Sequence, residues 1–343
     1  MSVPDPLPPR KPRRLGLYLP FVLLLAAAAV WSGVWFKARM ELGRRLDAGA
    51  EALRKTGYDV AWGSRSIGGY PFRMDVTLTD ARVRDPSGWA LAAPRLEAEA
   101  NMLSPGRWIM AAPQGVVFTR PVGGPVSVKG EIIRASLSGL EKTPPAFSFE
   151  GVKLAFQPAP GAQPFALTAA DRVEFHLRPG PDDQGGVFLR VDGGKARLAG
   201  LFARVAGDRP VSLSWNSTLS KMGRFAGATW PEAVRAWSDA GGQISVRDAG
   251  LTAGDAVLGV QPGTLSVGPD GRIRGSLDLT LRQAPKAITA LADTGAISPE
   301  AAQAAAVVAA ARRDGETARA TLTFQAGQTT FGPVAVAPAP RVY

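Results

Sequence analysis

The chain has 343 residues, of which 45% are hydrophobic and 20% are charged. This length suffices for one large domain, or two smaller ones, with a hydrophobic core. There is no cysteine, which excludes disulfide bonds, thiolate metal sites, iron–sulfur clusters and cysteine nucleophiles. The formal net charge of +11 would suggest nucleic acid binding only if it were spread over a folded domain.

The excess positive charge is concentrated near the N-terminus. Residues 1–36 carry a net charge of +3 and residues 37–56 another +3, which leaves +5 for the rest of the chain, where both signs are interspersed. More than half of the excess therefore flanks one apolar segment, and membrane topology explains it better than a nucleic acid does. We expect no nucleic acid partner.

A run of uncharged residues at 15–36 predicts a transmembrane helix. At about 1.5 Å per residue it would extend roughly 33 Å, which matches the core of a bilayer. Tyr18 near one end and Trp31 and Trp35 near the other are placed as interfacial aromatic residues. The alternative is a cleaved signal peptide with its cleavage site at 26–29. Because the apolar run continues well beyond that site, an uncleaved anchor is favoured.

The flanking charges predict the orientation. Four basic residues lie in the leader 1–14, which favours a cytosolic N-terminus, whereas Lys37 and Arg39 beyond the apolar segment weakly oppose it. The leader is the denser cluster, and the bias toward Ala, Gly, Arg and Pro is typical of a GC-rich bacterium. We therefore expect a single-pass protein of the bacterial inner membrane, with its large C-terminal domain in the periplasm.

Residues 37–57 are predicted to form a juxtamembrane helix. Leu42, Leu46 and Leu53 fall on one stripe, and Gly57 supplies a C-terminal stop. Two interpretations remain open: a lever that docks the domain near the lipid surface, or an ordinary helix packed on the domain that it introduces.

After this helix the hydrophobic period changes to strict alternation, which predicts strands with one apolar and one polar face. Such strands are typical of antiparallel sheet that covers something on one side. We therefore expect a mainly β protein with a few helices, in which the transmembrane helix is followed by an extended or curved antiparallel β-sheet domain. The alternation is plainest at 72–79, 173–178, 211–216, 273–282 and 320–325.

Helical patterns return late in the chain, at 230–239, 285–293 and 298–312. The first of these has Thr229 as its N-cap and Pro231 in its first turn. A division near 207–210 separates a first β-rich half, 58–209, from a second half, 210–343, with inserted helices. These halves are compatible with one continuous sheet.

The most distinctive local motif is Gly68, Gly69, Tyr70, Pro71, Phe72 and Arg73. In a functional interpretation, its aromatic side chains form a rim that meets lipid or a partner. In a structural interpretation, the glycines permit a sharp bend and the proline fixes entry into the next strand. The structural role is favoured.

Catalytic constellations are not apparent in the sequence. His176 is the only histidine and lies on the polar face of a strand, where a solvated residue is expected. Asp182 and Asp183 are flanked by glycines and predict a hairpin loop. Nucleotide-binding, EF-hand and serine hydrolase motifs are missing. We expect a protein that is not an enzyme, with no catalytic, cofactor or metal site; an unrecognised hydrolase is the remaining alternative.

Several segments resemble the DUF2125 family of alphaproteobacterial envelope proteins, over nearly the whole chain after the anchor. They are the strand at 58–62, the motif at 68–73, the turn at 88–89, the helix-rich insertion before the last strands and the element at 331–334. The family name implies no established activity. The architecture also resembles, more loosely, AsmA-like and lipopolysaccharide-transport-associated envelope proteins, in which a curved sheet or groove presents an apolar face to lipids.

These observations lead to two functional hypotheses. The first is an anchored protein that binds lipid or lipid-linked molecules or aids envelope assembly, with no cofactor. The second is a tethered structural scaffold for another envelope protein. Whether the apolar strand faces close on one another or line an open groove distinguishes the two, and alternation alone is compatible with both.

Overall fold

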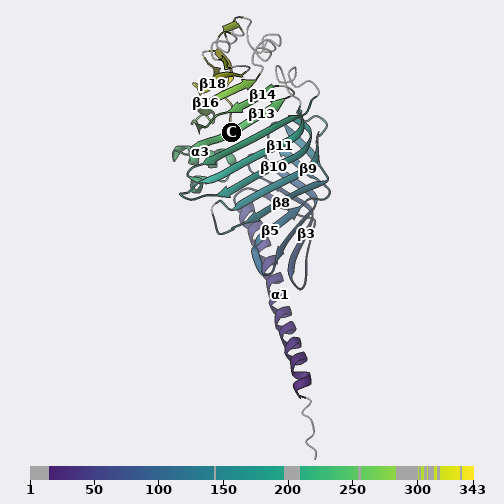
Figure 1. Ribbon diagram of the computed structural model, residues 1–343. Coiled ribbons are helices and arrows are strands. Elements are labelled where there is room, and N and C mark those ends of the chain that lie inside the picture. Colours follow the sequence, from purple (N-terminus) through teal and green to yellow (C-terminus); the bar gives the residue numbers. More distant parts are fainter. Residues whose placement is uncertain are drawn as a thin grey trace, which may run out of the picture.

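The computed structural model describes residues 15–142, 144–196, 209–253, 256–282, 317–332 and 334–343, together with residues 300, 303, 304, 307, 313 and 314. Within these residues the chain is mainly antiparallel strand with few helices (Figure 1). This confirms the fold class predicted from the alternating patterns.

The N-terminal helix α1 (Leu15–Lys55) is continuous, so the predicted transmembrane and juxtamembrane helices form a single element. Gly57 ends it with a positive φ of 91° and donates its backbone N–H to the Arg54 carbonyl. The first part of α1 projects away from the sheet (Figure 1) and carries exposed apolar side chains from Tyr18 to Val30. Among the described helices, α1 is the one long and apolar enough to cross a membrane.

The described strands form one antiparallel sheet. The strands of its first part are β1 (Asp59–Ala61), β2 (Ser64–Gly68), β3 (Arg73–Arg84), β4 (Ala90–Asn101), β5 (Ser104–Ala111), β6 (Val116–Arg120), β7 (Gly124–Lys129), β8 (Ile132–Ser138), β9 (Ala146–Pro158), β10 (Leu167–Pro179) and β11 (Gly185–Ala196). The remaining strands are β12 (Val211–Leu219), β13 (Ile244–Ala253), β14 (Ala256–Val260), β15 (Gly263–Val267), β16 (Ile273–Arg282), β17 (Arg313–Asp314), β18 (Thr317–Gln325), β19 (Gln328–Phe331) and β20 (Val334–Pro338).

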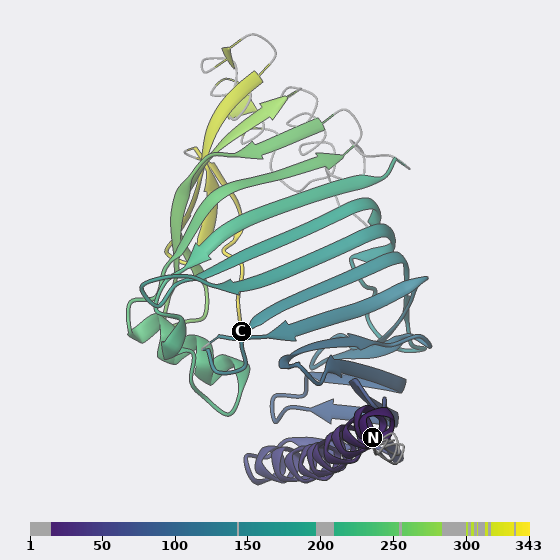
Figure 2. The same cartoon turned by 60° about the horizontal axis from the view of Figure 1, so that its bottom comes forward.

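A meander of long strands, β9 to β13, forms the middle of the sheet, and the sheet forks on each side of it. At one fork, β9 pairs with both β7 and β8, and these lead through β6 and β5 to β4. At the other fork, β13 pairs with both β14 and β15, which both pair with β16. The pairing of β11 with β12 continues the sheet across residues 209–210. Figure 2 shows that the resulting sheet is strongly curved.

The hydrophobic core gathers at the two forks. One cluster contains Val126, Ile133 and Leu154 from β7, β8 and β9. A second contains Val246, Leu265 and Leu277 from β13, β15 and β16. Each cluster thus lies where the sheet divides, because two diverging branches present their apolar faces to a common interior.

The helix α3 (Trp230–Asp239) forms as predicted. The Thr229 hydroxyl accepts the backbone N–H of Glu232 at 3.4 Å, and Pro231 stands in the first turn. The helix buries Val234 and Trp237 against Val267 of β15. A short 3₁₀ helix, η1 (Met222–Arg224), precedes it. The predicted helix 285–293 lies outside the described residues, and within 298–312 residues 300, 303, 304 and 307 are described, all helical.

Candidate functional site

The part of α1 that follows the apolar segment contacts β1 and β2 at the edge of the sheet, and a cavity open to solvent lies between this helix and one face of the sheet. Its volume is about 620 Å³. On the helix, Ala38, Leu42 and Leu46 form one wall because residues four apart share a helix face. The facing wall is formed by side chains from β3, β4, β5, β8 and the adjoining turns, namely Met74, Val76, Leu78, Leu96, Ala98, Met102, Pro105, Trp108, Met110, Leu137 and Leu140.

Strand register explains why these side chains share a face. Val76 of β3 lies opposite Ala98 of β4, and Ala98 lies opposite Met110 of β5. Leu137 of β8 lies in the next row on the same face, since its partner Trp108 is two residues before Met110 on β5. Directly paired residues point to the same side of a sheet, so alternation within each strand becomes one apolar surface across four strands.

The charged residues that line the cavity are Glu41 and Arg45 of α1. The Arg45 Nε donates to Glu41 Oε1 at 2.8 Å, and Arg44 lies 3.6 Å from the same carboxylate. The hydrogen bond from Arg45 holds the pKa of Glu41 below its ordinary value. In this pair the Arg45 side chain is largely exposed and the Glu41 side chain is partly exposed. The cavity therefore combines apolar walls with an ion pair at its solvent side, an arrangement suited to an amphipathic ligand.

The motif 68–73 fastens the sheet to α1 at the end of the apolar segment. Trp31 Nε1 donates to the Pro71 carbonyl at 2.9 Å, and Trp35 Nε1 donates to the Arg73 carbonyl at 2.9 Å. The Ser32 hydroxyl is 2.8 Å from the Tyr70 hydroxyl, and the Tyr70 ring stands edge-on to Trp35 at 5.4 Å. The structure thus brings the motif, which was singled out from sequence, together with the aromatic end of the predicted membrane span.

The two glycines of the motif differ in their surroundings. Gly69 has a φ of 94°, and a Cβ there would lie 2.7 Å from the Arg73 carbonyl oxygen. At Gly68 a Cβ would meet no atom within 4 Å. The sharp bend expected from the sequence therefore depends on Gly69, whose lack of a side chain lets its carbonyl accept the Arg73 N–H at 2.8 Å.

A second fastening holds the other end of the same helical segment. Arg65 of β2 donates two hydrogen bonds to the carboxylate of Asp47, at 2.6 and 3.1 Å. The hydrogen bond from Arg65 lowers the pKa of Asp47 below its ordinary value. Further along, the Arg54 guanidinium donates to the Val60 carbonyl. The helix wall of the cavity is therefore held at several points, from Trp31 to Arg54.

Apolar side chains continue from the cavity along the middle of the sheet. Leu137 pairs with Phe147 of β9, and Phe147 with Leu177 of β10. Phe175 of β10 pairs in turn with Leu189 of β11. These four residues beyond Leu137 are half-buried, in contrast to the fully buried clusters at the two forks. An apolar band of intermediate exposure thus connects the cavity region with the second half of the sheet.

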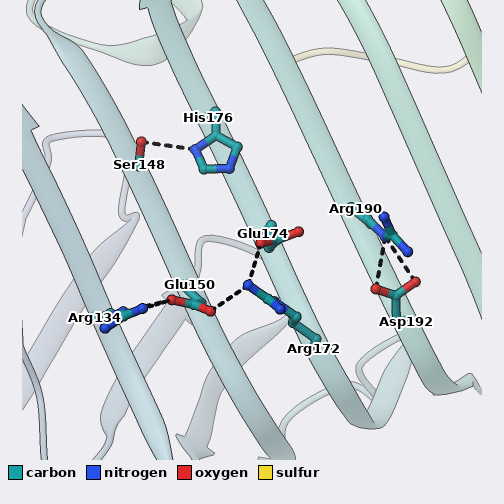
Figure 3. A network of polar contacts seen from close by, with 8 residues as sticks. All are labelled: Arg134, Ser148, Glu150, Arg172, Glu174, His176, Arg190 and Asp192. Carbon is teal, nitrogen blue, oxygen red and sulfur yellow. Dashed lines mark hydrogen bonds and ion pairs between the residues drawn. The ribbon is translucent and has the colours of Figure 1, made fainter.

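The opposite face of β8 to β11 carries a ladder of polar contacts (Figure 3). Glu150 accepts hydrogen bonds from Arg134 at 2.6 Å and from Arg172 at 2.7 Å, and Arg172 also contacts Glu174 at 2.8 Å. On the neighbouring strand, Arg190 pairs with Asp192. The two contacts of Glu150 join direct or diagonal cross-strand neighbours of opposite charge and so stabilise strand pairing. The Arg172–Glu174 and Arg190–Asp192 contacts each join residues two apart on the same strand.

His176 lies on this polar face, as predicted, but it is half-buried rather than fully solvated. Its Nδ1 is 2.9 Å from the Ser148 hydroxyl, and its ring stacks on Phe188 at 5.8 Å. Figure 3 shows the pair on neighbouring strands, at the end of the ladder. These two contacts account for the position of the imidazole.

Asp182 and Asp183 form the hairpin turn between β10 and β11, both with positive φ. The Asp183 carboxylate accepts the backbone N–H of Gly223 at 2.7 Å, and the backbone carbonyl of Asp183 accepts the backbone N–H of Met222. The hairpin interpretation therefore holds, and Asp183 also ties this turn to η1. Within the described ranges, no group of three potential metal ligands is found.

The sequence profile of the DUF2125 family, described as an uncharacterized protein conserved in bacteria, matches residues 35–340. No curated protein and no solved structure matches the chain. The matched region begins at Trp35, where the sheet is fastened to α1, and includes the cavity and every described strand. The chain therefore belongs to the DUF2125 family of bacterial proteins.

Proposed function

We propose that the protein is a non-enzymatic, single-pass protein of the inner membrane whose periplasmic domain binds the apolar chains of lipids or lipid-linked molecules. The observation that carries the proposal is the apolar cavity between α1 and the sheet, which begins at Ala38, directly after the uncharged segment 15–36 of the helix. A lipid chain could pass from the bilayer to this cavity without crossing much water.

The size and chemistry of the cavity support a lipid chain as the ligand. A volume of about 620 Å³ falls within the roughly 300–1,000 Å³ of small-molecule sites. Each methylene group transferred from water to apolar walls contributes about 0.8 kcal/mol. The walls are aliphatic side chains, methionines and one tryptophan, and methionine adapts its shape to flexible apolar ligands.

The ion pair at the solvent side supports an amphipathic ligand. A chain in the cavity would leave its polar head beside Glu41 and Arg45, where the exposed guanidinium can hydrogen-bond a phosphate or carboxylate. Competition between Glu41 and such a headgroup for Arg45 would tune affinity for anionic lipids.

The periplasmic location is supported by the basic leader before the span and by the position of the sheet at the opposite end. A C-terminal alkaline phosphatase fusion tests it: an active fusion is expected. An inactive fusion, together with an active cytosolic reporter at the same position, would contradict the orientation.

Native mass spectrometry of the full chain released from lipid nanodiscs tests lipid binding. A lipid retained after the annular lipids have been stripped from α1 is expected for the wild type. Ala98→Trp, which fills the cavity, should remove the retained lipid, whereas Ile109→Trp, on the opposite and exposed face of β5, should keep it. Equal retention by both variants, or none by the wild type, would contradict the proposal.

A further inference from the structure

Two neighbouring turns of the sheet carry exposed apolar side chains at the end where α1 leaves it. They are the turn Gly69–Phe72 before β3 and the turn Met102–Leu103 between β4 and β5, together called the paired tips below. Phe72 is 64% exposed and Leu103 is 78% exposed. The backbone N–H of Met102 donates to the Phe72 carbonyl at 2.9 Å, so the two turns lie side by side.

Contacts with α1 fix the level of the paired tips relative to the membrane span. Pro71 and Tyr70 are hydrogen-bonded to Trp31 and Ser32, which lie inside the uncharged segment that ends at Phe36. At 1.5 Å per residue, Trp31 lies about 7.5 Å before the end of that segment. This matches the roughly 5–10 Å to which interfacial elements enter the headgroup and acyl boundary.

We propose that the paired tips insert into the outer surface of the bilayer that α1 crosses, as a second membrane contact. A lipid surface fits better than a polypeptide partner because the hydrogen bonds to Trp31 and Ser32 place the exposed Phe72 and Leu103 at the depth of lipid. Trp31 and Tyr70 are also of the type that is enriched at this depth.

The exposed basic residues near the paired tips are consistent with placing the tips at the surface of the bilayer. Lys37 and Arg39 follow the apolar segment of α1 by one to three residues, and Arg107 lies four residues beyond the end of the second turn. Arg39 covers the Trp35 ring at 5.9 Å. Long basic side chains near the end of a span extend to the phosphate level, so a basic girdle follows the apolar tips.

Insertion would hold the domain against the membrane instead of leaving it on a free tether. Met102 belongs to the second turn and also lines the cavity, so the cavity would lie directly above the bilayer surface. The inference stands independently of lipid binding in the cavity, since the tips are exposed and the cavity walls are not needed for insertion.

Because the chain lacks cysteine, single cysteines can report the depth of chosen positions. Leu103→Cys and Phe72→Cys test the two tips, and Val122→Cys is a matched control. Val122 is an apolar turn residue, 84% exposed. It follows β6, which pairs with the start of β4, whereas Leu103 follows the end of β4. Each variant of the full chain is labelled with an environment-sensitive nitrobenzoxadiazole dye and reconstituted into phosphatidylcholine–phosphatidylglycerol vesicles.

The expected result is a blue shift of the dye at positions 72 and 103, with loss of its fluorescence when shallow nitroxide-labelled lipids are included. The dye at position 122 should show neither change. If the dyes at positions 72 and 103 gave the same spectra and quenching as the dye at position 122, the tips would remain in water and the proposal would be overturned. That outcome would also be obtained if the tips bound a polypeptide partner instead of lipid. Circular dichroism of each labelled variant confirms that the sheet is intact.

Discussion

Trp35 donates its indole N–H to the backbone carbonyl of Arg73, and the two residues join α1 to the start of β3. The Trp35 side chain is only 3% exposed. This contact couples the apolar helix to the sheet, because Trp35 lies in the last turn of the apolar segment and Arg73 begins β3, which contributes to the cavity wall. The apolar helix and the sheet are thereby one structural unit.

Trp35→Phe should destabilise this junction. The phenyl ring keeps most of the packing against Tyr70, but the Arg73 carbonyl loses its donor, a loss that costs about 1–3 kcal/mol when the group stays buried. Thermal unfolding of the detergent-solubilised chain measures the effect. Trp230→Phe is the control, since Trp230 also donates to a carbonyl, that of Val342, but is exposed. Equal shifts for both variants would contradict the role assigned to Trp35.

Gly69→Ala should disturb the motif far more than Gly68→Ala. The positive φ of Gly69 and the 2.7 Å approach of its hypothetical Cβ to the Arg73 carbonyl imply strain of about 1–3 kcal/mol. A Cβ on Gly68 would enter open space, so Gly68→Ala is the matched control. Trp31 and Trp35 fluorescence should change for the Gly69 variant alone; similar spectra for both variants would show that the bend does not depend on Gly69.

The Asp47–Arg65 contact predicts a pH dependence. Because the pKa of Asp47 is lowered in the folded protein, the ion pair contributes stability at pH values above the ordinary value of 3.8. That contribution is lost as the pH falls through the lowered pKa. The difference in unfolding temperature between wild type and Asp47→Asn should therefore be present at neutral pH and vanish in acid.

The control for this prediction is Asp239→Asn, which removes an exposed carboxylate at the end of α3. It should change the unfolding temperature less than Asp47→Asn at neutral pH, since no ion pair of this carboxylate is found within the described part of the chain. A difference for Asp47→Asn that is independent of pH would contradict the assignment to the ion pair.

Ala98→Trp should fill cavity space without unfolding the sheet. Small-to-large changes in a packed core usually cost about 1–3 kcal/mol, but here Ala98 faces the cavity between β4 and α1. The unfolding temperature in lipid-free detergent is therefore expected to stay close to that of wild type. A large decrease would indicate that the space is already filled by side chains.

Much of the fold was predictable from the sequence, because its strands alternate cleanly and its α3 helix carries local capping signals. The pattern at 273–282 became β16, and Thr229 caps α3 as expected. These features depend on residues close together in the chain, where side-chain period and backbone hydrogen bonds decide the structure locally. The long apolar helix α1 was recognisable for the same reason.

The cavity was not predictable, because it depends on the register of distant elements. Leu42 and Leu46 were recognised as a helix stripe, but Met110 and Leu137, which they face, lie far along the chain. The contact between Asp47 and Arg65 and the forks at β9 and β13 are likewise long-range pairings. The apolar stripe on the helix and the alternation in the strands indicate that both apolar surfaces are covered. They do not indicate whether the two surfaces pack together fully or leave a cavity between them.

The measurement that tests lipid binding most directly is photo-cross-linking in vesicles with a phospholipid that carries a diazirine on its acyl chain. Adducts mapped by mass spectrometry are expected on the exposed apolar part of α1, around Leu24, and also on Met74 and Met110 inside the cavity. Ala98→Trp should remove the cavity adducts and keep those on α1, which serve as an internal control. Adducts confined to α1 in the wild-type protein would contradict the account.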